Sequence, residues 1–124
     1  MNKNNDNDYY YRIVLAYEIP YNVLDNNNNT ADKVQARENL YDTLGNMVPE
    51  DKYEKFSVKL ALFQLKDTFN YIVTYEAFFR STAGLPMEEW VEADEIKQKA
   101  KVEIETFFSA MDCDYKQINI KTLL

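Results

Sequence analysis

The 124-residue chain contains no histidine, and this absence excludes more chemistry than any other feature of its composition. Catalysis by Ser-His-Asp or Cys-His groups, and zinc or iron sites with histidine ligands, are excluded in their usual forms. The two glycines lie far apart, so the sequence has neither a P-loop nor a dinucleotide-binding fingerprint. The composition therefore predicts no cofactor and no metal site, and it favours a protein that is not an enzyme.

Cysteine, proline and long apolar runs are also scarce. The single cysteine, Cys113, permits no internal disulfide. We interpret it as a packed thiol in a reducing cytoplasm, with an intermolecular disulfide as the alternative. No segment approaches the roughly 20 apolar residues that span a bilayer, and the polar N-terminus lacks the apolar region of a secretory signal. We expect a cytoplasmic protein without a membrane partner, with a mobile tail at 1–8 and a single domain at 9–124.

What the chain does contain is a segment, 55–80, in which two runs of β-branched and aromatic residues flank a polar break at 66–68. This pattern predicts a β-hairpin. With a two-residue turn at Asp67-Thr68, three apolar pairs oppose each other: Leu62 and Val73, Leu60 and Tyr75, and Phe56 and Phe79. Because opposed residues of an antiparallel pair lie on the same side, this register places both apolar faces on one core.

The spacing of apolar residues predicts four further elements: strands at 9–19 and 115–124, and helices at 31–47 and 86–112. Asn29 or Thr30 is expected to cap the first helix, and Gly45 either closes it or lies in its last turn. The expected buried face of this helix comprises Val34, Arg37, Leu40, Tyr41, Leu44 and Met47. Pro86 is expected at the first position of the second helix.

The order strand, helix, strand, strand, helix, strand predicts an α+β protein with a ferredoxin-like βαββαβ sandwich. In this fold a four-stranded antiparallel sheet carries two helices on one face, and the first and third strands are central. The other face is left open. The same alternation assigns to it Arg12, Glu18, Lys59, Thr74 and Glu76, with Gln117, Asn119 and Lys121 from the last strand.

Six apolar residues are also expected on the open face: Val14, Ala16, Ala61, Phe63, Ile72 and Phe78. Single exposed apolar residues are ordinary on protein surfaces, but a group on three adjacent strands is typical of an interface. The leading hypothesis is therefore a non-enzymatic protein-interaction module. It associates with itself, as a homodimer, or with a protein partner through this face.

The net charge of −7 supplies a second hypothesis. Such a chain repels phosphate backbones and anionic membranes, and it favours basic partners. An acidic patch is expected at the start of the second helix: Glu88, Glu89, Glu92, Asp94 and Glu95. Acidic first turns are ordinary in helices, and a Mg²⁺ or Ca²⁺ site would need further oxygen ligands. The patch also suits an acidic inhibitor that mimics nucleic acid and blocks a nucleic-acid-binding protein.

RNA recognition motifs share the predicted topology and stack bases on aromatic residues of the sheet. The third strand here lacks their glycine and basic residue, and Tyr71 and Tyr75 are expected to point toward the helices. Glu18 and Glu76 on the open face would repel phosphate, so we expect no direct binding of nucleic acid. These two carboxylates form an acid–base pair only if a substrate pocket joins them, and cross-strand contacts with Arg12 or Lys59 are the simpler expectation.

Overall fold

The computed structural model describes residues 10–24, 30–51, 53–66, 68–81 and 86–119, without the side chains of 81 and 86–92. Six elements follow one another along the chain: β1 (Tyr10–Ile19), α1 (Ala31–Gly45), β2 (Tyr53–Gln64), β3 (Tyr71–Ser81), α2 (Pro86–Ala110) and β4 (Lys116–Ile118). All six elements predicted from the sequence are present. The expected tail at 1–8 lies outside the described residues.

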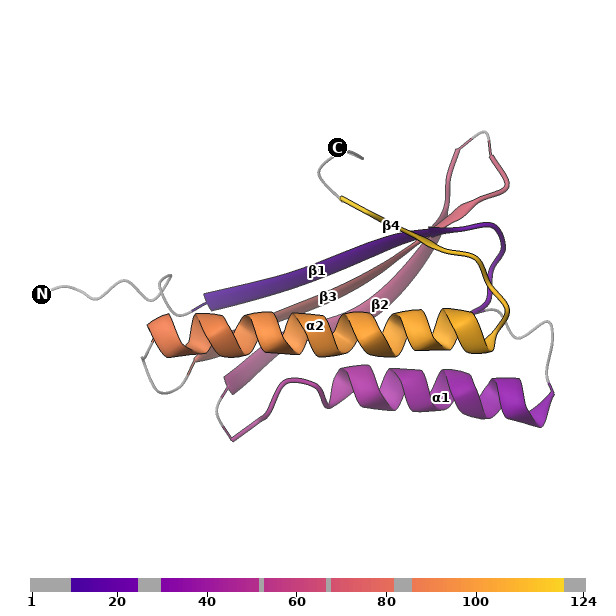
Figure 1. The fold of residues 1–124 in the computed structure, drawn as a ribbon. Helices are drawn as coiled ribbons and strands as arrows, with labels where there is room; N and C mark the ends of the chain where they lie inside the picture. The colour runs from indigo at the N-terminus through magenta and orange to yellow at the C-terminus, as the bar shows by residue number, and fades with distance from the viewer. Residues whose placement is uncertain (1–9, 25–29, 52, 67, 82–85, 120–124) are drawn as a thin grey trace, which may run out of the picture.

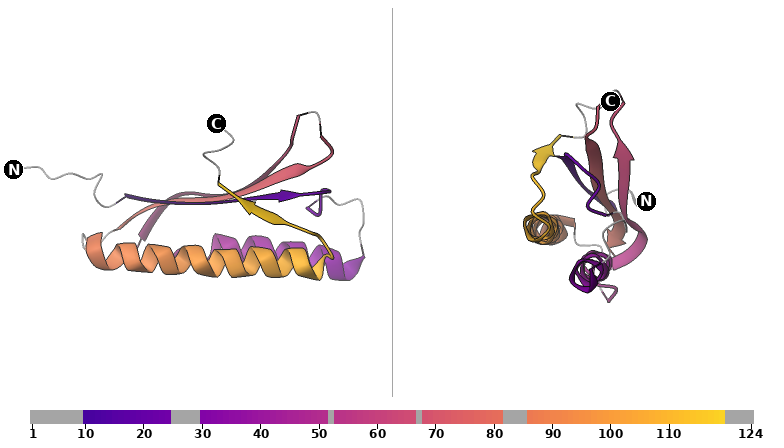
Figure 2. Two further views of the ribbon diagram at one scale, coloured as in Figure 1. Left: turned by 45° about the horizontal axis from the view of Figure 1, so that its top comes forward. Right: turned by 90° about the vertical axis from the view of Figure 1, so that its right-hand side faces the viewer.

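The strands form one antiparallel sheet in the order β2-β3-β1-β4. The protein is thus an α+β protein with β3 and β1 in the middle of the sheet, as the sequence predicts. Both helices lie on the same side of the sheet, and the hairpin between β2 and β3 bends away from them (Figures 1 and 2). One face of the sheet is therefore covered by α1 and α2, and we call the other the open face.

The core lies between the helices and the covered face. Alternate residues of β1, from Tyr11 to Ile19, are buried there, and so are Ala100, Ile104 and Phe107 of α2. The buried residues of α2 thus recur at three- and four-residue steps, as the helix predicted at 86–112 requires. The prediction for α1 is wrong at one position, because Tyr41 is exposed while Arg37, Leu40 and Leu44 are buried.

The two helices end in different ways. Gly45 is the last residue of α1 and lies in its final turn. At the end of α2, Asp112 adopts a left-handed conformation with φ of 53°. The amide of Cys113 donates to the Phe108 carbonyl at 2.9 Å, and that of Asp112 donates to the Ser109 carbonyl at 3.1 Å. This is a Schellman-type termination in which aspartate takes the place usually held by glycine.

Thr30 is the N-cap of α1 by its backbone, but its side chain makes no capping hydrogen bond. Its carbonyl accepts from the amides of Lys33 and Val34, both at 3.1 Å. Asn29, the alternative cap, lies outside the described residues. Pro86 is the first residue of α2, as predicted.

The hairpin register is confirmed over most of its length, since Leu62 pairs with Val73 and Leu60 with Tyr75. The turn is displaced from the predicted position. The amide of Thr68 donates to the Leu65 carbonyl at 3.3 Å, so the turn begins at Leu65 rather than at Lys66. Asp67 itself lies outside the described residues.

The prediction for the last strand is wrong about its faces. Ile118 pairs with Ala16, and Gln117 pairs with Tyr17. Because directly paired residues share a side, Ile118 lies on the open face and Gln117 on the covered side, the reverse of the expectation. Alternation separates the residues of this strand into two faces, but it does not show which of the two faces lies toward the helices.

Candidate interaction surface

A β-bulge in β2 changes which residues reach the open face. The pairing with β3 shifts between Lys55 and Ser57, so that Lys55 opposes Phe79 and Ser57 opposes Phe78. Phe56 is the extra residue, and 44% of its surface is exposed. The prediction that Phe56 faces Phe79 in the core is therefore wrong. A bulge reverses the alternation of a strand on one side of it.

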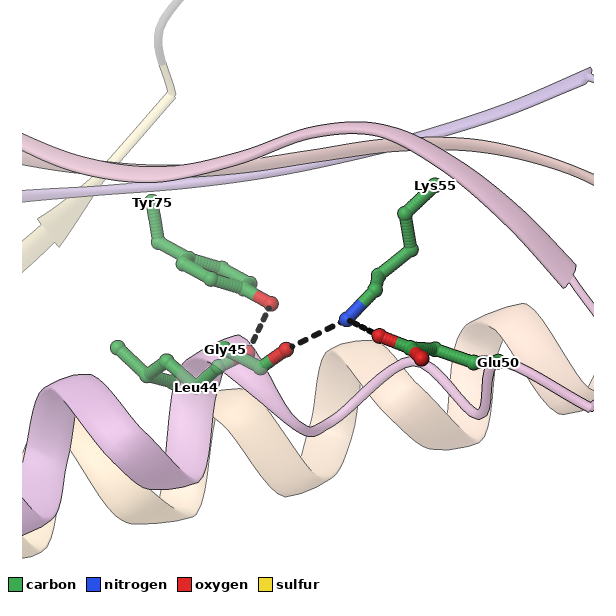
Figure 3. Close-up of polar contacts among 5 residues, drawn as sticks. All are labelled: Leu44, Gly45, Glu50, Lys55 and Tyr75. Atoms are coloured by element: carbon green, nitrogen blue, oxygen red, sulfur yellow. Dashed lines mark hydrogen bonds and ion pairs between the residues drawn. The ribbon is translucent and has the colours of Figure 1, made fainter.

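The bulge places Lys55 over the end of α1 (Figure 3). Its ammonium group donates to the Gly45 carbonyl at 3.0 Å and lies 3.1 Å from a carboxylate oxygen of Glu50. The Tyr75 hydroxyl donates to the preceding carbonyl, of Leu44, at 3.3 Å. A cation at this position complements the negative end of the helix dipole and satisfies a terminal carbonyl. These contacts favour the bulged register over a regular one.

On the open face, Phe56 joins Tyr10 and Phe78 in what we call the aromatic cluster. The ring of Tyr10 stacks on both others, with centroids 5.6 Å from Phe56 and 5.7 Å from Phe78. The rings of Phe56 and Phe78 lie 5.3 Å apart. The three rings come from three different strands, so the cluster is held by the sheet itself. Aromatic contacts of this geometry contribute beyond their buried area.

Two guanidinium groups lie over this cluster. The guanidinium carbon of Arg12 is 4.9 Å from the centre of the Phe78 ring, and that of Arg80 is 5.9 Å from the centre of the Tyr10 ring. Arg80 also pairs with Glu54 at 2.8 Å, and this carboxylate raises the pKa of the guanidinium. Cations over ring faces are favourable. Arginine and aromatic residues together are typical of the energetic centres of protein interfaces.

The charges of the open face nearly balance. The strand pairing assigns to it the cations Arg12, Lys59, Arg80 and Lys116 and the carboxylates Glu18, Glu54 and Glu76. Glu76 lies 3.6 Å from Arg12 and 3.8 Å from Lys59, as the sequence suggested. Since the whole chain carries −7, its excess negative charge belongs to residues outside the open face.

The six residues predicted as an interface all lie on the open face, but they differ in exposure. Phe63 is 47% exposed, and Val14, Ala61 and Phe78 are partly exposed. Ala16 and Ile72 are buried, at 2% and 0%. Next to Ile72, the Asn70 side-chain amide donates to Glu18 at 2.6 Å across neighbouring strands. The apolar surface therefore has two exposed parts, the aromatic cluster near one end and Phe63 near the other.

The aromatic cluster is the part of this surface that sequence reasoning missed. Strict alternation places Phe56 on the core side of the sheet and Phe78 on the open side, so it does not bring the three rings together. Strict alternation suits both Lys55 and Phe56, so the signal in the sequence is Tyr53, an aromatic residue that the same alternation places on the open face. A bulge between Tyr53 and Val58 reverses the alternation and lets Tyr53 be buried.

The acidic patch is described only in part. Asp94 and Glu95 are exposed on α2. Residues Glu88, Glu89 and Glu92 belong to the helix, but their side chains lie outside the described residues. Nearby on the outer surface, a groove of about 480 Å³ runs between the helices and is lined by Thr43, Met47, Gln98, Lys99, Val102 and Glu103.

A polar cluster on the covered side joins α2 to β1 and to the start of β4. Glu105 accepts hydrogen bonds from Tyr17 at 2.9 Å and Tyr115 at 3.2 Å, and it lies 2.9 Å from the Lys101 ammonium group. Burial by itself would raise the pKa of Glu105, but the hydrogen bonds from Lys101 and Tyr17 lower it overall. Burial and the Glu105 carboxylate raise the pKa of Tyr17. These groups stabilise one another in a fixed arrangement.

The remaining chemical hypotheses gain no support from the geometry. Glu18 and Glu76 lie four ladder positions apart along the sheet, or roughly 13 Å, which is too far for a shared proton. Among the described residues, no three histidine, cysteine or acidic side chains are placed to hold a metal ion. No helix in the described part of the chain has the length and apolar character needed to cross a membrane.

Burial also governs the single thiol. Cys113 is buried, and its burial raises its pKa to about 11. A thiol in this state is a poor nucleophile at neutral pH.

The open face carries the most distinctive arrangement of exposed side chains in the described structure. Comparisons of this chain with protein family models, with curated proteins and with solved structures find no match.

Proposed function

We propose that this protein is a non-enzymatic interaction module that associates with another protein surface, in the first instance a second copy, through its open sheet face. The observation that carries the proposal is the pairing of the aromatic cluster with an exposed Phe63 on the sheet face opposite the helices. Exposed aromatic rings that lie on a rigid sheet offer contact area at a small cost in side-chain entropy.

The strand order β2-β3-β1-β4 and the two helices on one side support the ferredoxin-like assignment made from the sequence. In such an arrangement the sheet is half covered, and the uncovered side is the natural surface for association. Topology by itself does not specify a function, so the proposal depends on the side chains of the open face.

Two other classes of partner are less well supported. Single-stranded nucleic acid also stacks on aromatic rings and contacts arginine, but Arg12 and Arg80 here lie beside Glu76 and Glu54. Their charges are thus already partly neutralised. A basic protein bound to the acidic patch is favoured by the net charge of −7, and its binding would weaken strongly with added salt.

Sedimentation equilibrium across a wide range of protein concentrations tests the proposal. We expect the average mass of the wild-type protein to rise from one chain toward two as concentration increases. Phe56→Glu and Phe63→Glu should each shift this transition to higher concentration by at least about tenfold, because a carboxylate buried in an interface costs more than 1.4 kcal/mol. Val102→Glu, an equally apolar-to-acidic change on the exposed side of α2, should leave it unchanged.

A wild-type protein that remains a single chain at every concentration would contradict self-association. Equal effects of all three substitutions would show that the open face has no special role. Binding of a labelled oligothymidine that is lost in Phe56→Glu would assign the face to single-stranded nucleic acid instead.

A further inference from the structure

The open face is complementary to itself in one orientation, and from this we infer the arrangement of a dimer. The inference rests on the proposed function. We propose that two copies pack sheet against sheet about a two-fold axis that lies between the sheets, perpendicular to the strands. The strand pairing sets rows of residues that run across the three long strands. Two neighbouring rows on the open face are Val14, Glu76 and Lys59, and Ala16, Thr74 and Ala61. The axis passes between these two rows.

The middle of this arrangement suits close approach. Thr74 and Ala61 are small and partly exposed, and they stand side by side with Ala16, which is small and buried, on three adjacent strands. The axis brings this row against Val14, Glu76 and Lys59 of the second copy. Small residues opposite larger ones allow two sheets to reach the usual spacing of about 10 Å.

The ends of the sheet are then brought together with matching chemistry. One row further out, the axis places Arg12 of each copy against Glu18 of the other. On β2 it places the bulged Phe56, beside Ser57, against Phe63. Each contact occurs twice by symmetry, as an interface between identical surfaces requires.

The alternative axis, parallel to the strands, gives a poorer match. It would bring Arg80 of one copy against Arg80 of the other, and Glu76 against Glu76, because both lie on the middle strand of the three long ones. Like charges that meet across an interface are strongly unfavourable. The perpendicular axis avoids these contacts.

The charge of the whole chain also selects this face. Two copies that each carry −7 repel one another, but the charges that the strand pairing assigns to the open face nearly balance, so contact through this face adds little repulsion of its own. In the sheet-to-sheet arrangement the outer helical layers are roughly 30 Å apart, at about 10 Å per layer. This exceeds the Debye length of about 8 Å at physiological ionic strength, so the repulsion is largely screened.

The size of the contact fits a reversible dimer. Three strands of about ten residues offer a rectangle of roughly 33 by 14 Å, or about 500 Å² from each copy. The total of about 1,000 Å² is at the lower limit for a specific interface. We therefore expect a dimer that dissociates on dilution.

Short-range cross-linking tests the arrangement. Phe56→Cys and Phe63→Cys proteins are prepared separately in a Cys113→Ser background, one with an affinity tag, and are mixed at a concentration where the wild type is dimeric. Within one copy the two positions are roughly 23 Å apart on the same strand, which is beyond the reach of a short dimaleimide. Between copies they are predicted to be adjacent.

We expect the mixture to give a cross-linked dimer that contains one tagged and one untagged chain. Each protein alone should give little cross-linked dimer. A matched mixture with cysteine at Val102 in place of Phe63 should give little as well. Efficient cross-linking of Phe56→Cys with itself would overturn the arrangement in favour of the axis parallel to the strands. Absence of any cross-link in a sample whose dimer is intact by sedimentation would overturn it too.

The two proposals fail in different ways. If the wild type does not associate, the proposed function is wrong and the arrangement with it. If the wild type forms a dimer that Phe56→Glu and Phe63→Glu disrupt, while the mixed cross-link is absent, the open face is the interface and only the orientation is wrong.

Discussion

Phe78 and Phe79 are neighbours in β3, and they lie in opposite environments. Phe79 is fully buried on the covered face, where its ring lies 4.9 Å from that of Tyr53 and 5.6 Å from that of Tyr11. Phe78 is partly exposed on the open face, within the aromatic cluster. The sheet therefore has aromatic residues on both faces. The helices, rather than residue type, decide which face forms the core.

Charged residues differ between the two faces in the same way. On the covered side Lys55 satisfies the end of α1 through the Gly45 carbonyl. On the open side Lys59 lies 3.8 Å from Glu76 at the surface. One lysine joins two layers of the fold, and the other remains accessible to a partner. The difference in role should appear as a difference in stability.

The largest expected effect separates the two phenylalanines. Phe79→Ala should lower the free energy of unfolding by about 3–5 kcal/mol, because it leaves a cavity in the core. Phe78→Ala should cost roughly 1–2 kcal/mol, since only part of its ring is removed from water. Urea denaturation at low protein concentration, where the monomer is measured, gives both values. An equal loss for the two variants would contradict the distinction between the faces.

Much of this distinction is predictable from the sequence. The alternation in β1 and the hairpin identifies Leu60, Leu62, Val73 and Tyr75 as one side of the sheet, and the pairing confirms this register. The six apolar residues of the open face were placed on the correct side for the same reason. Period-two alternation is a local property, and it survives wherever the strand is regular.

The rest depends on contacts between distant parts of the chain. The bulge at Phe56 is favoured by the reach of Lys55 to Gly45 and Glu50, which no local pattern contains. Which face of β4 lies toward the helices depends on its pairing with Ala16 and Tyr17. These are tertiary effects, so alternation predicted the side of the sheet on which the six apolar residues lie but not the aromatic cluster.

The second prediction compares the two lysines. Lys55→Met should lower the free energy of unfolding by about 1–2 kcal/mol, because the Gly45 carbonyl loses a charged donor and the end of α1 loses a favourable cation. Lys59→Met should change it by no more than about 0.5 kcal/mol, since exposed ion pairs contribute little. Thermal unfolding of both variants provides the measurement. A larger loss for Lys59→Met would mean that the ion pairs of the open face, rather than the helix end, stabilise the fold.

The smallest effect concerns the Tyr75 hydroxyl, and pH makes it measurable. Burial raises the pKa of Tyr75 from 10.0 to about 12. Because the folded-state pKa is the higher one, the associated stability is fully present below pH 10.0 and is lost as pH rises through about 12. At neutral pH, Tyr75→Phe should therefore lower the free energy of unfolding by about 1 kcal/mol or less, because only the hydrogen bond to the Leu44 carbonyl is removed. Above pH 10.0, the free energy of unfolding of this variant should fall less steeply with pH than that of the wild type.

Urea denaturation at neutral and alkaline pH measures both terms of the Tyr75 prediction. In Tyr75→Phe, the slope of the free energy of unfolding against pH should be smaller than in the wild type but not zero, because the pKa of Tyr17 is also raised by its burial. Tyr41→Phe, on the exposed side of α1, controls for the loss of a surface hydroxyl. If Tyr75→Phe leaves the alkaline slope unchanged, Tyr75 ionises without leaving the core. The covered face would then admit water beside Leu44, and the contrast between a sealed face and an open one would be weaker than the packing indicates.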